Sequence, residues 1–337
     1  MDAQSQWTGL DAGRLERITD HIERNYIRPG KIAGCQVAVA RHGHSAYFKS
    51  FGQMDLERAK PMADDAIFRI YSMTKPITSV ALMTLYERGY FQLNDPVSRF
   101  VPSWKNHRVW VSGEGADMVT EAPHRPVSFR DVLTHMSGLT YGGGLPGVGI
   151  QHPIDQIYRD LKVRSVGGRD TMMEFLDKLG QVPLRYQPGE QWMYSLATDV
   201  CGALVEVISG RPLADYLREE IFEPLGMKDT AFFVPPEKTD RFCANYQRMP
   251  DKSLKLIDDP KDGMALEPDD YGVLTRIVID TLHRPIALVL EGGYGPSQGE
   301  AVRAIFLALL GEPVRLPGGT PHPSTQRVVR ALRLLSG

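Results

Sequence analysis

The chain has 337 residues, 42% of them hydrophobic, which is enough for one large domain or two ordinary domains with a proper core. Its 39 basic and 41 acidic residues give a formal net charge of -2, which is not the composition of a protein that binds nucleic acid or an anionic membrane surface. Cys35, Cys201 and Cys243 are too few and too widely spaced for a disulfide framework or a zinc site. We therefore expect no nucleic-acid partner and no structural metal.

The N-terminus and the hydropathy pattern bear on location. Residues 1–6 have neither the basic start nor the apolar run of a secretory signal peptide. No stretch of the chain approaches the roughly 18 consecutive apolar residues of a membrane-spanning helix. The sequence therefore predicts a cytoplasmic protein without a membrane partner.

The N-terminal part of the chain predicts a helix followed by a β-hairpin. Residues 11–27 have apolar side chains three or four positions apart and are followed by Pro29 and Gly30, which is typical of an amphipathic helix and its end. Residues 34–40 and 45–51 have strand composition and flank a short glycine-containing turn.

Residues 68–82 predict a buried helix that begins just after a serine. Pro76 fits the first turn of a helix, where its missing N–H is not needed. Ser72 then lies at the helix N-terminus, with Lys75 one turn further on the same face. The expected inward face consists of apolar residues at helical spacing: Ile77, Val80, Ala81, Leu82, Leu85 and Tyr86.

This arrangement can activate a nucleophile. A lysine that has lost its proton can act as the base for a serine hydroxyl, and a helix N-terminus offers N–H groups to an oxyanion. The alternative is a capping serine followed by a solvated lysine, since a chain of this length contains about one Ser-x-x-Lys by chance. Ser72 is the one serine in the sequence with a lysine three residues later.

Beyond residue 100 the pattern predicts loops and short helices. Residues 103–127 are polar and mixed, which indicates a long surface excursion of the kind that often shapes a binding site. A short helix should run from Ser128, its cap, to Met136. Residues 141–147 are rich in glycine but lack the Gly-Lys-Ser/Thr end of a phosphate loop, so we expect a flexible loop beside a cleft. Further helices are expected over residues 198–208 and 213–222.

Four segments carry motifs that occur together in one superfamily. They are Tyr71-Ser72-Met73-Thr74-Lys75, Leu133-Thr134-His135-Met136-Ser137-Gly138-Leu139, the Pro188-Gly189 turn followed by Tyr194-Ser195, and Phe222-Glu223-Pro224-Leu225-Gly226-Met227. With them, residues 10–262 resemble the serine β-lactamase and penicillin-binding protein-like superfamily, in particular its class C-like esterase and carboxypeptidase branch.

The resemblance implies an α+β fold of the β-lactamase/transpeptidase type, with an antiparallel sheet flanked by helices and a helical subdomain. It implies that Ser72 is the acyl-forming nucleophile, Lys75 its activating partner and Tyr194 a second proton-transfer group. Two departures from the superfamily pattern matter. Leu196 stands where an asparagine amide would hold an acylamino group, which favours esters over β-lactams. The Lys-Thr-Gly element of the last strand, which supplies an oxyanion N–H, has no counterpart near the C-terminus, so turnover should be low.

The C-terminal part resembles a different family. Residues 284–294 are similar to the last strand and the glycine-tyrosine loop of the histone deacetylase and acetoin-utilisation family, in which the tyrosine matching Tyr294 polarises a carbonyl beside zinc. The zinc ligands of that family have no counterpart in residues 1–262. We therefore predict a truncated β-lactamase-like domain at residues 10–262 and a deacetylase-like fragment at residues 263–337 that replaces the missing sheet strands.

Taken together, the sequence predicts a serine hydrolase that cleaves esters or amides through an acyl-enzyme on Ser72. The expected partner is a small-molecule substrate, and no cofactor or metal is expected. Two alternatives stay open: a non-catalytic descendant that binds acyl or peptide ligands, and a zinc deacylase fragment. The sequence determines neither the substrate nor the oligomeric state.

Overall fold

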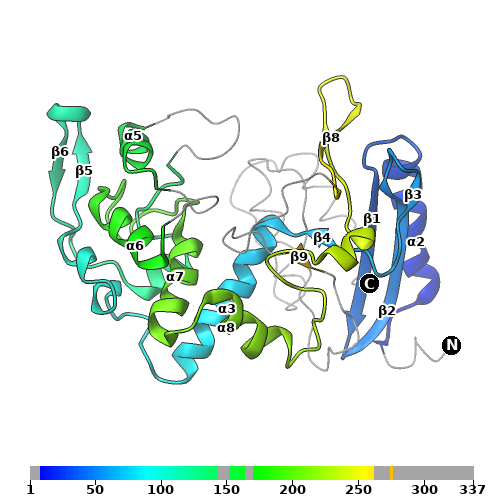
Figure 1. Ribbon diagram of the computed structural model, residues 1–337, viewed down its shortest axis with the longest axis horizontal. Coiled ribbons are helices and arrows are strands. Elements are labelled where there is room, and N and C mark those ends of the chain that lie inside the picture. Colours follow the sequence, from blue (N-terminus) through cyan, green and yellow to red (C-terminus); the bar gives the residue numbers. More distant parts are fainter. Residues whose placement is uncertain (1–7, 143–151, 164–169, 262–273, 276–337) are drawn as a thin grey trace, which may run out of the picture. The chain divides into compact units, whose positions relative to one another are not determined.

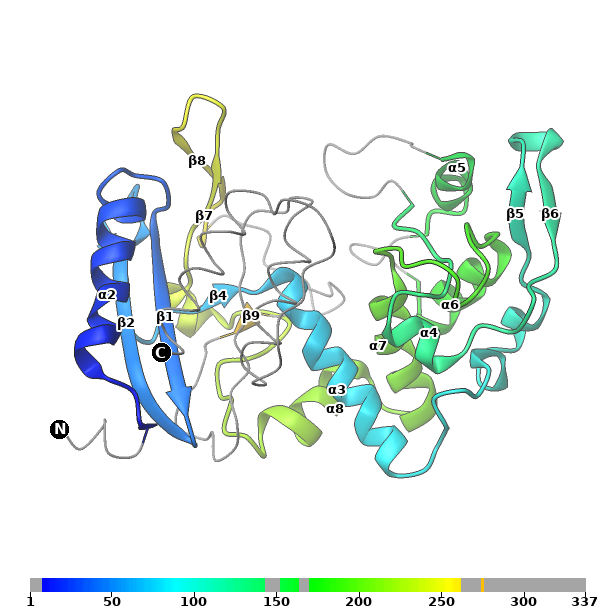
Figure 2. The ribbon, with the colours of Figure 1, turned by 180° about the vertical axis from the view of Figure 1, so that it is seen from behind.

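The chain divides into two units, Met1–Ile286 and Ala287–Gly337, and every element described below belongs to the first. Helices and antiparallel strands are both present, in agreement with the predicted α+β class (Figures 1 and 2). Three predicted features lie outside the described part: the glycine-rich loop from residue 143 on, the boundary at residue 262, and Tyr294 in the C-terminal tail. The structure, a computed structural model, describes these residues: 8–142, 152–163, 170–261 and 274–275.

The N-terminal helix and hairpin form as predicted. Helix α2 (Ala12–Ile22) continues into a π-helical turn (Glu23–Ile27) and lies along the sheet (Figures 1 and 2). Lys49 of the sheet anchors it, because its Nζ lies 2.7 Å from Glu16 Oε2 of α2. The sheet is antiparallel, with the strand order β1 (Gly34–Arg41), β2 (His44–Asp55) and β3 (Lys60–Pro61).

A predicted helix follows a short strand. Strand β4 (Phe68–Arg69) leads into a 3-10 turn (Tyr71–Met73), and α3 (Thr74–Glu87) starts with Pro76 in its first turn. The expectation for Val80 was wrong, because its side chain is 53% exposed. A polar residue completes the inward face, which keeps the helical spacing. The buried residues of α3 are Thr78, Ala81, Leu82 and Leu85.

The main core lies among the helices that follow. Helices α3 and α7 pack against each other (Figure 1). Apolar side chains of α3 and of the five helices given at the end of this paragraph form one continuous cluster. The sequence patterns predicted α4, α7 and α8 but missed α5 and α6. The elements are α4 (Phe129–Leu133), α5 (Pro153–Asp160), α6 (Met172–Gln181), α7 (Ala197–Ser209) and α8 (Leu213–Leu217), which continues as a π-helical turn (Arg218–Phe222).

The segment predicted as a surface excursion is more ordered than expected. A 3-10 turn (Val97–Arg99) precedes the segment. Within it lie two further 3-10 turns, most of Pro102–Asn106 and all of Gly115–Asp117, and a hairpin of β5 (Val109–Ser112) and β6 (Val119–Glu121). Trp104 and His107 are each only 3% exposed. Trp104 Nε1 donates to the Leu176 carbonyl at 2.9 Å, and the ring nitrogen of His107 lies 3.2 Å from the Leu179 carbonyl. The segment is therefore anchored to α6, which a polar sequence pattern does not reveal.

Strand β4, just before Ser72, is held from two sides. It pairs with β9 (Leu274–Thr275), and Arg69 Nε lies 2.5 Å from Asp258 Oδ2 at the end of β8. Arg69 also donates to the Cys243 carbonyl at 2.7 Å. A 3-10 turn (Pro236–Arg241) and the hairpin of β7 (Asn245–Arg248) and β8 (Leu254–Asp258) complete this region. The backbone that leads to Ser72 is thus tied to residues far away in the sequence.

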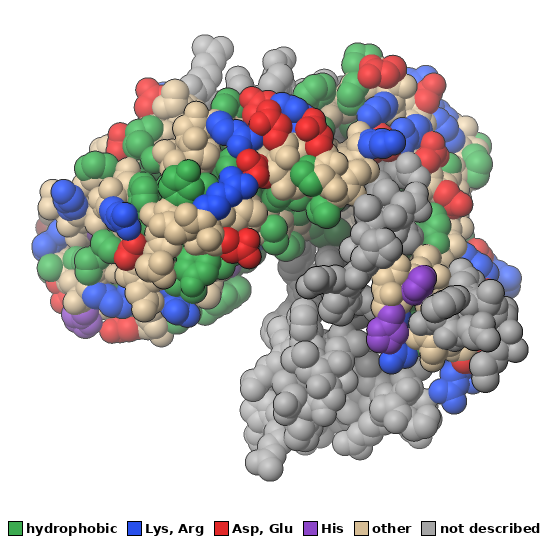
Figure 3. Space-filling view, turned by 90° about the horizontal axis from the view of Figure 1, so that it is seen from below, with side chains coloured by type: hydrophobic (Ala, Val, Ile, Leu, Met, Phe, Trp, Pro, Cys, Tyr) green, Lys and Arg blue, Asp and Glu red, His purple; other side chains and the backbone are tan. Residues whose placement is uncertain are grey.

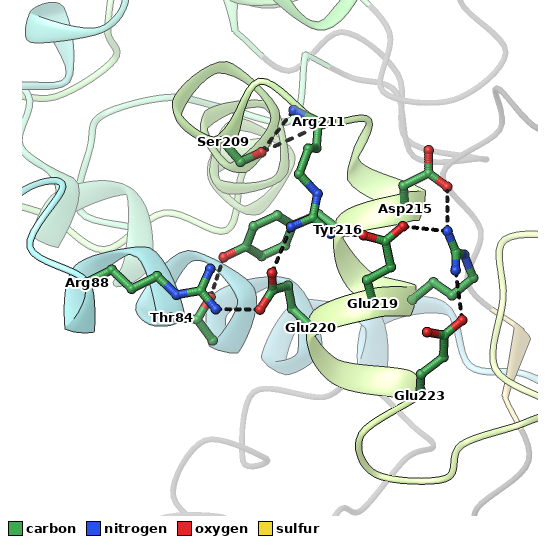
Figure 4. Close-up of polar contacts among 10 residues, drawn as sticks. Thr84, Arg88, Ser209, Arg211, Asp215, Tyr216, Glu219, Glu220 and Glu223 are labelled. Carbon is green, nitrogen blue, oxygen red and sulfur yellow. Dashed lines mark hydrogen bonds and ion pairs between the residues drawn. The ribbon is translucent and has the colours of Figure 1, made fainter.

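A network of ion pairs holds the end of α3 to α8 and its π-helical continuation (Figure 4). Glu220 pairs with Arg88, the C-cap residue of α3, and with Arg211, whose Nη1 lies 2.7 Å from Glu220 Oε1. The hydroxyls of Thr84 and Tyr216 lie 2.6 Å apart beside it. The hydrogen bonds from Arg88 and Arg211 lower the pKa of Glu220 to about 2. The network therefore joins the C-terminal end of α3, the helix that carries Lys75, to the π-helical turn after α8.

The charges on the surface are mixed. Lys and Arg side chains are interspersed with Asp and Glu side chains over the described surface that Figure 3 shows, in keeping with the small net charge. Among the helices of the described part, none is both long and apolar enough to span a membrane.

Candidate active site

The predicted nucleophile lies in a constrained turn. Ser72 belongs to the 3-10 turn between β4 and α3, and Tyr71 before it has a φ of 40°, in the left-handed region that non-glycine residues rarely adopt. The Tyr71 hydroxyl accepts a hydrogen bond of 2.6 Å from Asn245 Nδ2 of β7. Such strain persists where surrounding contacts over-determine a conformation, which is common at functional sites.

The structure brings the three predicted site residues together. Lys75 Nζ donates to Ser72 Oγ at 3.2 Å, and Ser72 Oγ lies 2.9 Å from Tyr194 Oη. Lys75 Nζ also lies 4.8 Å from the centre of the Tyr194 ring. All three side chains are partly buried. The serine hydroxyl therefore has both an amine and a phenol within hydrogen-bond distance, although Tyr194 is 122 residues away in the sequence.

Backbone hydrogen bonds place Tyr194 in this position. Met193 N–H donates to the His135 carbonyl at 2.9 Å, and Leu196 N–H donates to the Thr140 carbonyl at 3.2 Å. These two bonds flank Tyr194 on both sides in the sequence. The segment around His135, recognised in the sequence only as a motif, is thus the support that holds the tyrosine.

Two further bonds join the same segments and explain their glycines. Arg185 N–H donates to the Gly138 carbonyl at 2.7 Å, and Gly189 N–H donates to the Met136 carbonyl at 2.8 Å. Gly138 and Gly189 have φ values of 83° and 86°. A Cβ at Gly138 would lie 2.2 Å from the Tyr186 carbonyl oxygen, so this close approach requires glycine.

An ion pair between an exposed arginine and a buried aspartate supports the start of this region. Ser128 and Asp131 form a capping box at the start of α4, and Arg125 binds Asp131 with two bonds of 2.5 and 2.8 Å. Burial by itself would raise the pKa of Asp131, but the hydrogen bonds from Arg125 and Ser128 outweigh it, and the pKa is lowered. Since Met136 N–H donates to the Asp131 carbonyl at 2.8 Å, the pair is linked to the segment that supports Tyr194.

Aromatic side chains surround the tyrosine. The rings of His135 and Tyr141 stack on that of Tyr194, with centres 5.3 and 5.5 Å away. Trp192 lies at the margin, 60% exposed, with its ring centre 6.5 Å from that of Tyr194. The sequence pattern assigned no role to these three neighbours, although the alternation of Trp192 and Tyr194 before a helix was a usable signal.

Two other positions bear on the chemistry. Leu196 is 3% exposed and belongs to the main core, so position 196 offers no polar group to a substrate. Within the described ranges there is no group of three or more His, Cys, Asp or Glu side chains that could hold a metal ion. Tyr294 lies outside those ranges.

Comparison with known protein families identifies the family to which this fold belongs. A family model described as "Beta-lactamase" matches residues 19–313, and the chain belongs to this family. The predicted β-lactamase/transpeptidase-like fold is thereby confirmed. The match extends past residue 262 to residue 313, and the predicted resemblance of residues 263–337 to deacetylases is not shown by these comparisons.

Three individual relatives show the range of similarity. The chain is 31% identical over 305 residues to Esterase EstB of Burkholderia gladioli, covering 88% of this chain and 70% of EstB. It is 34% identical over 224 residues to Protein Rv1367c of Mycobacterium tuberculosis, covering 66% of this chain and 53% of that protein. It is also similar to the solved structure of "EstCE1, a hydrolase with promiscuous acyltransferase activity", with a TM-score of 0.61 and 27% identity over 78% of this chain and 68% of EstCE1. The chain thus spans about half to seven tenths of the length of these proteins.

Proposed function

We propose that this protein is a serine hydrolase that cleaves esters or amides through an acyl-enzyme on Ser72. The observation that carries the proposal is the contact of Ser72 Oγ with both Lys75 Nζ, at 3.2 Å, and Tyr194 Oη, at 2.9 Å. The names of EstB and EstCE1, an esterase and a hydrolase, support this reaction class.

In the proposed reaction Lys75 acts in its neutral form: Ser72 Oγ forms a bond to the acyl carbon and gives up its proton to the Lys75 amine. Tyr194, in contact with the same oxygen, passes a proton to the leaving alcohol or amine, so that neither a free alkoxide nor a free amide anion has to form. Water then attacks the acyl carbon and gives one proton to the Tyr194 oxygen. The bond from the acyl carbon to Ser72 Oγ breaks, Ser72 Oγ takes its proton back from Lys75, and the acid is released with the starting state restored. If an alcohol attacks in place of water, the product is a new ester, which is an acyl transfer of the kind ascribed to EstCE1.

Esters should be better substrates than β-lactams. Leu196 is buried in the core, so it provides no amide for the acylamino group of a β-lactam. Initial rates on p-nitrophenyl acetate and on a chromogenic cephalosporin test this point. A clear preference for the cephalosporin would contradict it.

Turnover should be low. The expected sequence element for the second oxyanion N–H is missing, and removing one such donor typically costs about 10²–10³ in rate, or roughly 3–4 kcal/mol. Acylation should therefore be slow but detectable.

Intact-mass analysis tests the proposal directly. After incubation with a p-nitrophenyl ester or a fluorophosphonate, the protein should carry one adduct that Ser72→Ala lacks. An adduct of equal yield in Ser72→Ala would refute the assignment of Ser72. Absence of any adduct in the unmodified protein would favour the non-catalytic acyl- or peptide-binding alternative, and stoichiometric zinc in the purified protein would favour the deacylase alternative.

A further inference from the structure

Within the Leu-Thr-His-Met-Ser-Gly-Leu segment, His135 contacts Tyr194, one of the three proposed catalytic groups. Its ring stacks on Tyr194, with ring centres 5.3 Å apart and an angle of 25° between the planes. Its carbonyl accepts the Met193 N–H at 2.9 Å, one residue before Tyr194. The same residue therefore contacts the tyrosine through its side chain and holds its backbone.

Hydroxyl groups fix the imidazole in turn. His135 Nδ1 lies 3.2 Å from Ser195 Oγ, and Nε2 lies 3.5 Å from Thr198 Oγ1 of α7. Ser195 Oγ already accepts the Ala197 N–H at 3.3 Å, so its own proton remains for His135 Nδ1. Both hydroxyl side chains are buried, with Ser195 at 0% exposure. The ring thus bridges the rigid start of α7 and the face of Tyr194.

The backbone at position 135 also selects the residue type. His135 has a φ of 57°, in the left-handed region, which histidine, asparagine and aspartate adopt more readily than other side chains. Among these three, only histidine offers an aromatic ring together with two hydrogen-bonding nitrogens.

Electrostatics keep this ring uncharged. Burial first, and the charge of Lys75 second, lower the pKa of His135 to about 4. Within the described residues, the ring also contacts the rings of Trp192 and Tyr194 and the hydroxyls of Ser195 and Thr198. At neutral pH the imidazole is therefore uncharged.

We propose that His135 is a positioning residue that fixes the phenol of Tyr194 at Ser72 Oγ by stacking on its ring while bound to Ser195 and Thr198. This inference rests on the proposed function, because the orientation of Tyr194 matters for catalysis only if Ser72 is acylated. His135 itself makes no bond to Ser72 and takes no proton in the reaction.

The test uses three substitutions and a matched control. His135→Phe keeps a ring but loses both hydrogen bonds, His135→Asn keeps a hydrogen-bonding side chain and the left-handed backbone but loses the ring, and His135→Ala loses both. His107→Asn is the control, since His107 is also a buried histidine with a pKa lowered to about 4, but it binds the Leu179 carbonyl of α6 instead.

Kinetics should separate positioning from binding. We expect His135→Ala to lower kcat on p-nitrophenyl acetate about 10- to 100-fold with KM changed less than threefold, as is typical when a catalytic group is misplaced. His135→Phe and His135→Asn should each recover part of the loss. His107→Asn should lower the melting temperature without changing kcat per folded molecule. Equal kcat in His135→Ala and the unmodified protein would overturn the inference.

A spectroscopic measurement keeps the inference independent of activity. With ¹³Cζ-labelled tyrosine, the NMR signal of Tyr194, assigned by its loss in Tyr194→Phe, should shift in each His135 variant and stay in place in His107→Asn. An unshifted Tyr194 signal in folded His135→Ala would refute the positioning role. Failure of the unmodified protein to form a Ser72 adduct would instead refute the proposed function, while the NMR result would still decide where His135 acts.

Discussion

At the scale of residues, one of the two contacts on which the proposed chemistry depends is that between the hydroxyls of Ser72 and Tyr194. Tyr194 contributes its phenol oxygen, 2.9 Å from Ser72 Oγ, and its ring, which stacks on His135 and Tyr141. These two contributions are separable, because phenylalanine keeps the ring and lacks the oxygen.

Tyr194→Phe should therefore slow acylation of Ser72 about 10²- to 10⁴-fold, the usual contribution of a general acid–base group, while the melting temperature stays within about 2 °C. Stopped-flow release of p-nitrophenol from p-nitrophenyl acetate measures the rate. The control is Tyr86→Phe, which alters a tyrosine that packs on Phe91 in the core. An unchanged acylation rate in Tyr194→Phe would remove the phenol from the mechanism.

A second residue-scale feature is the glycine at position 138. Gly138 and Gly89 both have positive φ, 83° and 79°, but a Cβ at Gly138 would lie 2.2 Å from the backbone oxygen of Tyr186, whereas a Cβ at Gly89 would meet nothing within 4 Å. Alanine substitutions at these two glycines therefore separate the energetic cost of a left-handed backbone from that of a steric clash.

Gly89→Ala should lower the free energy of unfolding by about 1 kcal/mol, the cost of a left-handed alanine. Gly138→Ala should cost at least about 2 kcal/mol more, because the backbone of residues 185–186 must move. Urea unfolding followed by circular dichroism measures both. Equal losses would show that the clash is relieved without cost.

At the scale of elements, α3 is held at both ends. The Arg69 pair with Asp258 and the β4–β9 ladder hold the chain before it, and Glu220 binds Arg88 at its C-terminus (Figure 4). This matters for the site because α3 carries Lys75, whose contact with Ser72 spans less than one helical turn.

The Glu220 network predicts a pH dependence of stability. Because the pKa of Glu220 falls to about 2 in the folded protein, the unfolded state binds more protons between about pH 4.3 and pH 2. The stabilisation is fully present above about pH 4.3 and is lost as the pH falls through about 2. Glu220→Gln should therefore reduce the drop in the free energy of unfolding between pH 5 and pH 3, measured with urea. Glu223→Gln, an exposed carboxylate on the same helix, is the control, and an equal effect of both changes would contradict the prediction.

At the scale of the whole molecule, the C-terminal part contributes at least one strand to the described structure. Leu274–Thr275 pairs with β4, two residues before the turn that holds Ser72. The unpaired edge of a short strand exposes N–H and C=O groups, so the loss of its partner should cost stability.

Two truncations isolate this strand. Deleting residues 287–337 removes the second unit and keeps β9, whereas deleting residues 264–337 removes β9 as well. The longer deletion should melt about 4–8 °C lower than the shorter one, on the basis of about two hydrogen bonds of about 1 kcal/mol each. Ester labelling of Ser72 per folded molecule should be similar in both, because Lys75 and Tyr194 remain. Loss of labelling only in the longer deletion would show that residues 264–286 supply a catalytic group.

The sequence by itself determined the features that depend on neighbours along the chain. The spacing of Ser72 and Lys75 placed both on one face of a helix, and α3 keeps them in contact. Ser128 and Asp131, three residues apart, form the capping box at α4. The turn at Gly43 and the strand patterns beside it predicted the hairpin. Each of these follows from local geometry, in which one turn or one cap fixes the outcome.

Only the tertiary structure decided the features that join distant segments. The approach of Tyr194 to Ser72 depends on hydrogen bonds to the segment around His135, and the burial of Trp104 depends on the carbonyls of α6. The exposure of Val80 depends on which face of α3 packs against α7. No spacing along the chain encodes these contacts, because each one is chosen by packing and hydrogen bonding between elements that are far apart in sequence and meet only in the folded protein.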